Sequence, residues 1–320
     1  MSQCQGIRIR AVLLAFLAAA CANNKEQSTT TFVNQEPTSG IVAVEGAKLS
    51  YSVEGSGLPC IVIGVAKIYP RAFSEQLREH FRLIFTDVRL DVPYEPSFQI
   101  SSITMGTFSE DIETVRRNLG FEKVCVIGHS INGVLALEYA RKYPEHTSHV
   151  IVIGSPPYIS DRSREIEAQF WEDDASEERK SILKRDTEIL KENQGGPSLY
   201  EAFLNEYIAN NAKYWFDPTY DSVWLWQGVE FSDESFEVYN HFQEVVVEGY
   251  SVTDGHEIST PVFLALGRYD YVIPYTLWND VRENIPNLDY YLFERSGHFP
   301  MLEEQALFDE KLIAWIKGAE

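Results

Sequence analysis

The spacing of hydrophobic and polar residues predicts strands that alternate with helices along most of the chain. Residues 41–44 and 48–53 alternate apolar and polar side chains around a Glu-Gly turn, which predicts an antiparallel hairpin. Short apolar runs predict buried strands at 60–63, 82–85, 124–127, 150–153, 261–266 and 289–293. Helical spacing predicts helices at 107–119, after Gly133 and at 305–317, the last with Leu307, Phe308, Leu312 and Trp315 facing inward. This alternation is typical of an α/β fold with a mostly parallel sheet and helices on both faces.

A long insertion interrupts the strand pattern before the strand at 261–266. Residues 158–258 contain a charged helical stretch at 162–192 and a second helix at 199–210, which predicts a helical cap. The core would then consist of residues 41–157 and 259–320. Ligands bind at the carboxyl edge of open α/β sheets, so such a cap would cover the ligand. Its aromatic residues should form the core of the cap, and several of them should line a pocket: Tyr214, Trp215, Phe216, Trp224 and Trp226.

The N-terminal segment has the pattern of a targeting signal. Arg8 and Arg10 precede an apolar run that is too short to span a bilayer, which predicts a signal peptide over residues 1–20. Small residues followed by Cys21 resemble a bacterial lipobox, in which Cys21 is lipidated; the alternative is secretory cleavage with Cys21 incidental. Polar residues 21–40 predict a flexible tether. The expected location is the bacterial cell envelope, with a lipid anchor on the extracytoplasmic side of a membrane.

The composition narrows the classes of partner. A formal net charge of -21 repels nucleic acid and anionic lipid headgroups, so no nucleic acid is expected and membrane contact is expected only through the lipid anchor. Cys60 and Cys125 lie in apolar strand-like runs, which predicts buried free thiols. No metal-ligand spacing is present, and neither a metal nor a cofactor is expected. No pattern indicates an oligomeric state.

Ser130 lies where the chain passes from the strand at 124–127 into the next helix. A strand that turns directly into a helix forces the turning residue into a strained backbone conformation and requires small neighbours, here Gly128 and Gly133. Such a turn raises the hydroxyl above the edge of the sheet and points the first N–H groups of the helix towards it. Ser130 is therefore a candidate nucleophile; the alternative is an ordinary junction with a surface serine.

The segment Gly-His-Ser-Ile-Asn-Gly at 128–133 resembles the nucleophile elbow of the α/β-hydrolase family, which often reads Gly-His-Ser-Met-Gly-Gly. Asn132 stands where the second elbow glycine is usual. The resemblance implies an α/β-hydrolase fold and a catalytic triad in the order serine, acid, histidine. The loop Gly-Arg-Tyr-Asp resembles the acid loop of the family and makes Asp270 the acid. The loop Ser-Gly-His-Phe-Pro resembles the histidine loop and makes His298 the base.

The family resemblance also implies an oxyanion hole. One donor is the backbone N–H of Ile131, directly after the nucleophile. The second comes from the loop after the third strand, where the family often reads His-Gly. This chain has Gly-Val-Ala at 64–66 and lacks both typical residues, but a backbone N–H does not depend on the side chain. The N–H of Ala66 is the expected second donor.

The substrate class rests on a narrower resemblance. Gly-Arg-Tyr-Asp and Gly-His-Phe-Pro-Met-Leu-Glu-Glu are similar to motifs of proline iminopeptidases, which must bind a free α-ammonium group. Residues 192–250 contain many acids and one Lys or Arg, Lys213, which favours a cationic substrate. The acidity of the whole chain is an equal explanation for this excess. Residues 236–242 resemble an amine-binding stretch of that family, which makes Glu237 a candidate for substrate binding.

Three classes of function remain. The leading one is a serine hydrolase of small amides or esters: an aminopeptidase if a cap carboxylate reaches the cleft, and otherwise a carboxylesterase. A non-catalytic binding protein on the same fold would have a broken triad, but all three members are present. A solute-binding lipoprotein would have two similar lobes, whereas the pattern here predicts one sheet with an insertion.

Overall fold

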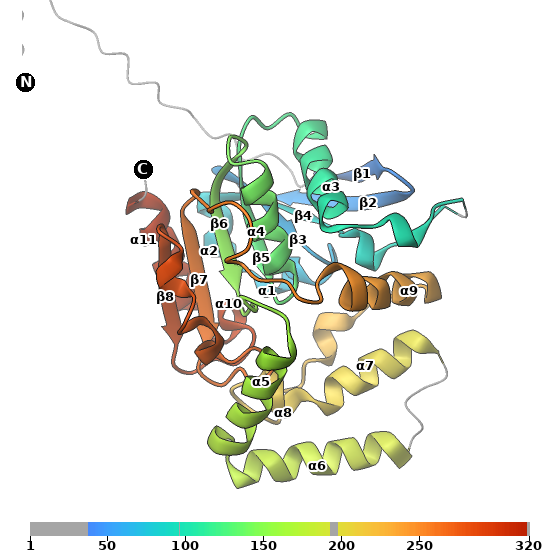
Figure 1. Cartoon of the computed structure of the whole chain (residues 1–320), viewed down its shortest axis with the longest axis vertical. Helices are drawn as coiled ribbons and strands as arrows, with labels where there is room; N and C mark the ends of the chain where they lie inside the picture. The colour runs from blue at the N-terminus through green and yellow to red at the C-terminus, as the bar shows by residue number, and fades with distance from the viewer. Residues whose placement is uncertain (1–37, 96, 193–197, 319–320) are drawn as a thin grey trace, which may run out of the picture. The chain divides into compact units, whose positions relative to one another are not determined.

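The computed structural model describes residues 38–95, 97–192 and 198–318. In this part of the chain, eight strands form one sheet in the order β1-β2-β4-β3-β5-β6-β7-β8 (Figure 1). β2 pairs antiparallel with β1 and β4, and the remaining neighbours are parallel. The mostly parallel α/β sheet is therefore confirmed. The strands are β1 (Thr38–Val44), β2 (Ala47–Glu54), β3 (Leu58–Ile63), β4 (Phe81–Thr86), β5 (Val124–His129), β6 (Thr147–Ile153), β7 (Val262–Gly267) and β8 (Leu288–Phe293).

Helices cover both faces of this sheet, because its central strands are apolar on both sides. In β5, Val124 and Val126 pack towards α3 and α4, whereas Cys125 and Ile127 pack towards α2 and α11. The helices of the core are α1 (Tyr69–Ala72), α2 (Glu75–His80), α3 (Met105–Asn118), α4 (Asn132–Lys142), α10 (Pro300–Glu303) and α11 (Gln305–Gly318). Its short 3₁₀ turns are η1 (Arg89–Asp91), η2 (Ile100–Ser102), η5 (Tyr275–Trp278) and η6 (Arg282–Asn284).

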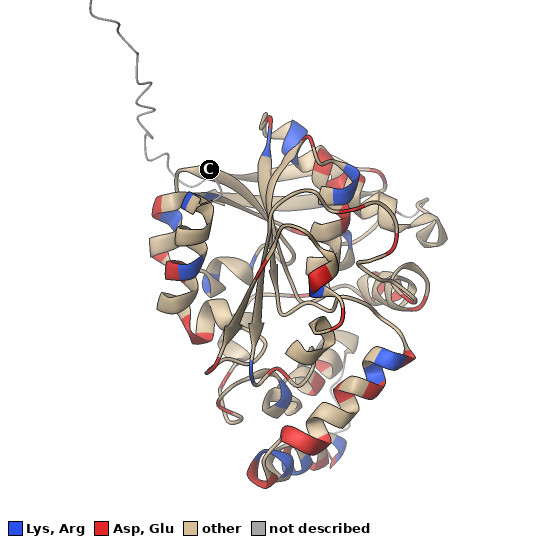
Figure 2. Ribbon diagram, turned by 60° about the vertical axis from the view of Figure 1, so that its left-hand side comes forward, with Lys and Arg blue, Asp and Glu red and all other residues tan. Residues whose placement is uncertain are grey.

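The segment between β6 and β7, which is called the cap below, is helical. It consists of α5 (Asp161–Asp174), α6 (Glu177–Glu192), α7 (Leu199–Ala209), α8 (Asn211–Tyr214), η3 (Val223–Trp226), α9 (Asp233–His241) and the π turn η4 (Phe242–Val246). Acidic and basic residues mark its helices, whereas the strands carry few charges (Figure 2). The single helical stretch expected at 162–192 is two helices. Ala175 is extended and ends α5, and the Ser176 hydroxyl accepts the N–H of Arg179 in the first turn of α6.

Two further expectations need correction at the ends of the core. β1 begins at Thr38, inside the segment expected to be a tether, because its backbone pairs with β2 from Thr38 onward. Leu307 is exposed rather than inward-facing, while Phe308, Leu312 and Trp315 are buried as expected.

The structure describes two of the cysteines but not the N-terminal segment. Cys60 and Cys125 are buried free thiols, which confirms their prediction. The signal peptide and Cys21 lie outside the described residues, and they remain predictions. Within the described ranges, no helix is long and apolar enough to cross a membrane.

Candidate active site

Ser130 occupies a strained turn between β5 and α4. Its φ is 56°, and no other non-glycine residue in the described ranges has a positive φ. The neighbours must be small: a Cβ on Gly128 would lie 2.2 Å from the carbonyl oxygen of Asn132, and a Cβ on Gly133 would lie 2.4 Å from the hydroxyl of Ser155. The strand–serine–helix pattern therefore produces the geometry of a nucleophile elbow.

Asp270 and His298 lie on loops that follow β7 and β8 at the carboxyl edge of the sheet. His298 Nδ1 is 2.7 Å from Asp270 Oδ2, and both side chains are buried. Asp270 Oδ1 also accepts the N–H groups of Val272 at 3.0 Å and Ile273 at 2.8 Å, which fixes the carboxylate. Nδ1–H must donate to the carboxylate, so Nε2 is left to act as a base. His298 and Ser130 line the same cavity.

Two residues near His298 were not predicted from the sequence. His129 Nε2 donates to the carbonyl oxygen of His298 at 2.9 Å, while its Nδ1 accepts the hydroxyl of Tyr69 at 3.1 Å. Burial, and then the neighbouring His298, keep the pKa of His129 well below its ordinary value, which agrees with a neutral ring that has one donor and one acceptor. These two hydrogen bonds connect the histidine loop to β5 and to α1. No local sequence pattern predicts them.

The geometry of the oxyanion loop contradicts the expectation for Ala66. The N–H of Ala66 donates to Asp87 Oδ1 at 2.9 Å, and Ala66 does not line the cavity. Val65 lines the cavity, and its N–H has no acceptor among the described residues. The same holds for Ile131, the first expected donor. Ile131 and Val65 are therefore the two candidate donors.

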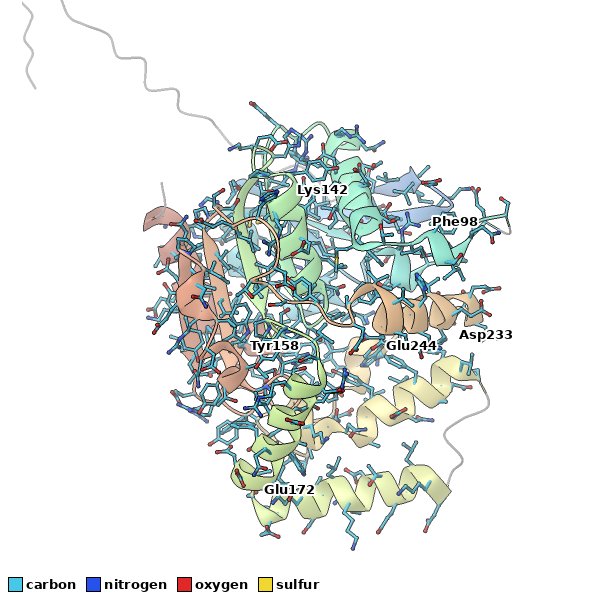
Figure 3. The ribbon with its side chains drawn as sticks, viewed as in Figure 1. Phe98, Lys142, Tyr158, Glu172, Asp233 and Glu244 are labelled. Atoms are coloured by element: carbon cyan, nitrogen blue, oxygen red, sulfur yellow. The ribbon has the colours of Figure 1, made fainter. Side chains whose placement is uncertain are left out.

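A cavity of about 400 Å³ lies over Ser130 and His298. Tyr158, one of its lining residues, lies where the chain leaves the sheet for α5 (Figure 3). The walls of the cavity are mainly apolar and aromatic. The hydroxyl of Tyr207 is buried there without a partner among the described residues. Two of the expected cap aromatics, Tyr214 and Trp226, line it, whereas Trp215 is buried in the core.

The carboxylate of the cavity is not the expected one. Glu237 is exposed on α9 and does not line the cavity. Glu167 on α5 is half-buried, lines the cavity and forms no ion pair within the described ranges. Burial raises its pKa, and the Lys213 ammonium acts in the opposite direction. Glu167 was not predicted from the sequence because the stretch around it is highly charged. The apolar Phe170, one turn further on the same face of α5, could have indicated that this face points inward.

The comparisons with known proteins agree with this geometry. Residues 69–305 match the family described as alpha/beta hydrolase fold. The chain belongs to this family. It is 31% identical to the AB hydrolase superfamily protein YclE of Bacillus subtilis (strain 168). The 287 aligned residues cover 87% of this chain and 98% of YclE.

Other alpha/beta hydrolases include both a peptidase and an esterase. A proline iminopeptidase of Clostridioides difficile (strain 630) is 27% identical over 226 residues, which cover 66% of this chain and 72% of that protein. The structure of a thermophilic esterase from Thermogutta terrifontis aligns with a TM-score of 0.59 at 16% identity, over 88% of this chain and 99% of the esterase chain. The esterase likeness concerns the fold, and the predicted α/β-hydrolase fold is confirmed.

Proposed function

We propose that this protein is a serine hydrolase that cleaves small amides or esters through an acyl-enzyme at Ser130. The observation that carries the proposal is the buried pair His298 Nδ1–Asp270 Oδ2 beside a strained serine in the same cavity. A strained turn is costly, and it persists where the surrounding structure holds it for a function. The buried carboxylate keeps His298 in the tautomer that a general base requires.

In the proposed reaction, the Ser130 Oγ attacks the substrate carbonyl carbon while His298 Nε2 takes the hydroxyl proton. The negative charge that develops on the carbonyl oxygen is stabilised by the N–H groups of Ile131 and Val65. The C–N or C–O bond then breaks, and the protonated His298 gives its proton to the leaving group. A water molecule attacks the acyl-enzyme by the same route and restores Ser130.

Within this reaction, we propose an aminopeptidase of the proline iminopeptidase type. Glu167 supports it, because a carboxylate that lines an aromatic cavity without an ion pair can receive a substrate ammonium group. The other charged side chain of the lining, Arg164, is engaged with Glu248 and Asp161. The similarity to proline iminopeptidases points to the same class.

A carboxylesterase is the second candidate. The wall of the cavity contains aliphatic side chains such as Ile68, Ile159 and Leu277, which suit a neutral acyl group. An ester of an uncharged acid would leave Glu167 unpaired, and this cost is small only while Glu167 stays in contact with solvent.

A fluorophosphonate probe tests the proposed reaction directly. The wild-type protein should be labelled, and Ser130→Ala should be unlabelled and lose several orders of magnitude of turnover. Labelling that survives in Ser130→Ala would exclude Ser130 as the nucleophile. A panel of aminoacyl anilides and simple acyl esters then separates the aminopeptidase from the carboxylesterase.

A further inference from the structure

A buried arginine of the cap binds backbone carbonyl groups instead of a carboxylate. Arg179, on α6, is 5% exposed, and no ion pair to it occurs in the described ranges. Its Nη1 donates to the carbonyl oxygens of Ala212 at 2.6 Å and Trp215 at 2.7 Å, and its Nη2 donates to that of Phe216 at 2.6 Å. Desolvation of a charge is costly, so such an arrangement needs good geometry to persist.

A carboxylate of the core binds the same segment from its other side. Glu303, on α10, accepts the N–H of Phe216 at 2.7 Å through Oε1. Through Oε2 it accepts the N–H groups of Gly297 at 2.8 Å and Phe299 at 3.3 Å, on either side of the catalytic histidine. Glu303 thus joins the histidine loop to the cap segment that Arg179 holds.

We propose that Arg179 and Glu303 form a clasp across Phe216 through which the cap positions the loop of His298. Arg179 donates to the carbonyl oxygens of Trp215 and Phe216, and Glu303 accepts the N–H of Phe216. The two charges act at opposite ends of the polarised backbone groups, so each strengthens the hydrogen bonds of the other. Arg179 and Glu303 are positioning residues, because neither touches the cavity over Ser130.

The histidine loop lies directly against the clasped segment. The N–H of His298 donates to the carbonyl oxygen of Tyr214 at 2.6 Å. A Cβ on Gly297 would lie 2.2 Å from that same oxygen, so only glycine allows this approach of the two backbones. A shift of the segment at 214–216 would therefore move His298 and its Nε2 relative to Ser130. The inference rests on the proposed function, because the position of Nε2 matters only if Ser130 is the nucleophile.

Hydrogen exchange tests the clasp without any catalytic step. Arg179→Met removes the charge and keeps a long apolar side chain, and Arg179→Lys restores the charge with fewer donors. The matched control is Arg185→Met, which changes an exposed arginine of the same helix. We expect the amides of 214–216 and of 296–299 to exchange about tenfold faster or more in Arg179→Met, with Arg179→Lys intermediate and the control unchanged.

Kinetics provide the second measurement. Misplacement of His298 by about 1 Å should slow fluorophosphonate labelling about a hundredfold in Arg179→Met. In substrate turnover, the loss should appear in kcat rather than in KM. Glu303→Gln should cause a similar loss. The double variant should be no slower than the slower single variant, because one clasp is broken in all three.

The outcomes separate this inference from the proposed function. Absence of labelling in the wild-type protein would reject the proposed function, and hydrogen exchange would still decide whether the clasp exists. Faster exchange at 214–216 with unchanged exchange at 296–299 would overturn the clasp, as would normal labelling rates in Arg179→Met. If thermal unfolding shows that Arg179→Met does not fold, Arg179→Lys carries the test, and wild-type exchange and labelling in it would overturn the inference.

Discussion

Replacement of Glu167 by glutamine tests the proposed substrate class most directly. The change removes one negative charge from the cavity and leaves the shape of the side chain nearly unchanged. A hydrogen bond between a carboxylate and an ammonium contributes about 1.5–3 kcal/mol, which corresponds to about 10- to 150-fold in kcat/KM. Glu167 is only half-buried, so water screens the contact and the expected loss is about tenfold.

The assay compares a free aminoacyl anilide with its N-acetylated counterpart. The wild-type protein should prefer the free amine, and Glu167→Gln should lose this preference while it cleaves the acetylated compound at the wild-type rate. Burial and then the nearby Asp270 raise the pKa of Glu167, and Lys213 lowers it. The preference should therefore fade as the pH falls through the pKa of Glu167. A change of pH that acts on the shared reaction steps slows both substrates alike, so the ratio of the two rates isolates Glu167.

A matched control and three possible outcomes test the role of Glu167. Glu165→Gln changes an exposed carboxylate of the same helix, which pairs with Arg162, and it should leave the ratio unchanged. An unaltered ratio in Glu167→Gln would refute the role of Glu167. Equal cleavage of the acetylated compound by the wild-type protein would replace the aminopeptidase with a carboxylesterase. A preference that disappears at high salt in the wild-type protein would indicate long-range steering rather than contact.

Three other changes have defined outcomes. Asp270→Asn should keep the fold and lose about four orders of magnitude in kcat, because His298 is left in the wrong tautomer; near-normal turnover would show that another carboxylate holds it. Burial and Asp87 raise the pKa of Asp91 from 3.8 to about 8. As the pH rises between those values, the folded protein should therefore lose up to about 1.4 kcal/mol of stability for each pH unit, because the buried carboxyl resists ionisation. In thermal unfolding, Asp91→Asn should therefore be more stable than wild type at pH 9 and no different near pH 4; an equal gain at both would contradict this. Cys21→Ser should release the protein from the detergent phase after expression in a bacterial host, and a wild-type protein that is already fully soluble would exclude the lipid anchor.

The sequence predicts the features that depend on neighbouring residues and misses those that depend on distant ones. The strained turn at Ser130 could be predicted because a buried strand, small neighbours and a helix adjoin it in the chain. Ala66 was chosen over its neighbour because nothing local shows that Asp87, at the end of another strand, takes its N–H. The position of Glu237 outside the cavity could not be predicted for a similar reason: the direction of each cap helix is set by its packing, and the composition of the cap is acidic throughout.

Asn132 links the two unusual motifs of this chain. It stands where the elbow glycine is usual, and its amide lies against Gly64, where a Cβ would be 2.8 Å from Nδ2 and 2.3 Å from the ring of Tyr69. The Asn132 amide and the Tyr69 ring therefore approach the same point beside Gly64, and burial raises the pKa of Tyr69. Tyr69 begins α1, directly after the loop that carries Val65. The asparagine thus brings the start of α4 next to the loop of Val65, the proposed second oxyanion donor, in a chain that lacks the usual His-Gly pair there. The two departures from the family pattern therefore lie side by side, and Gly64, which has no side chain, leaves the space that the Asn132 amide and the Tyr69 ring occupy.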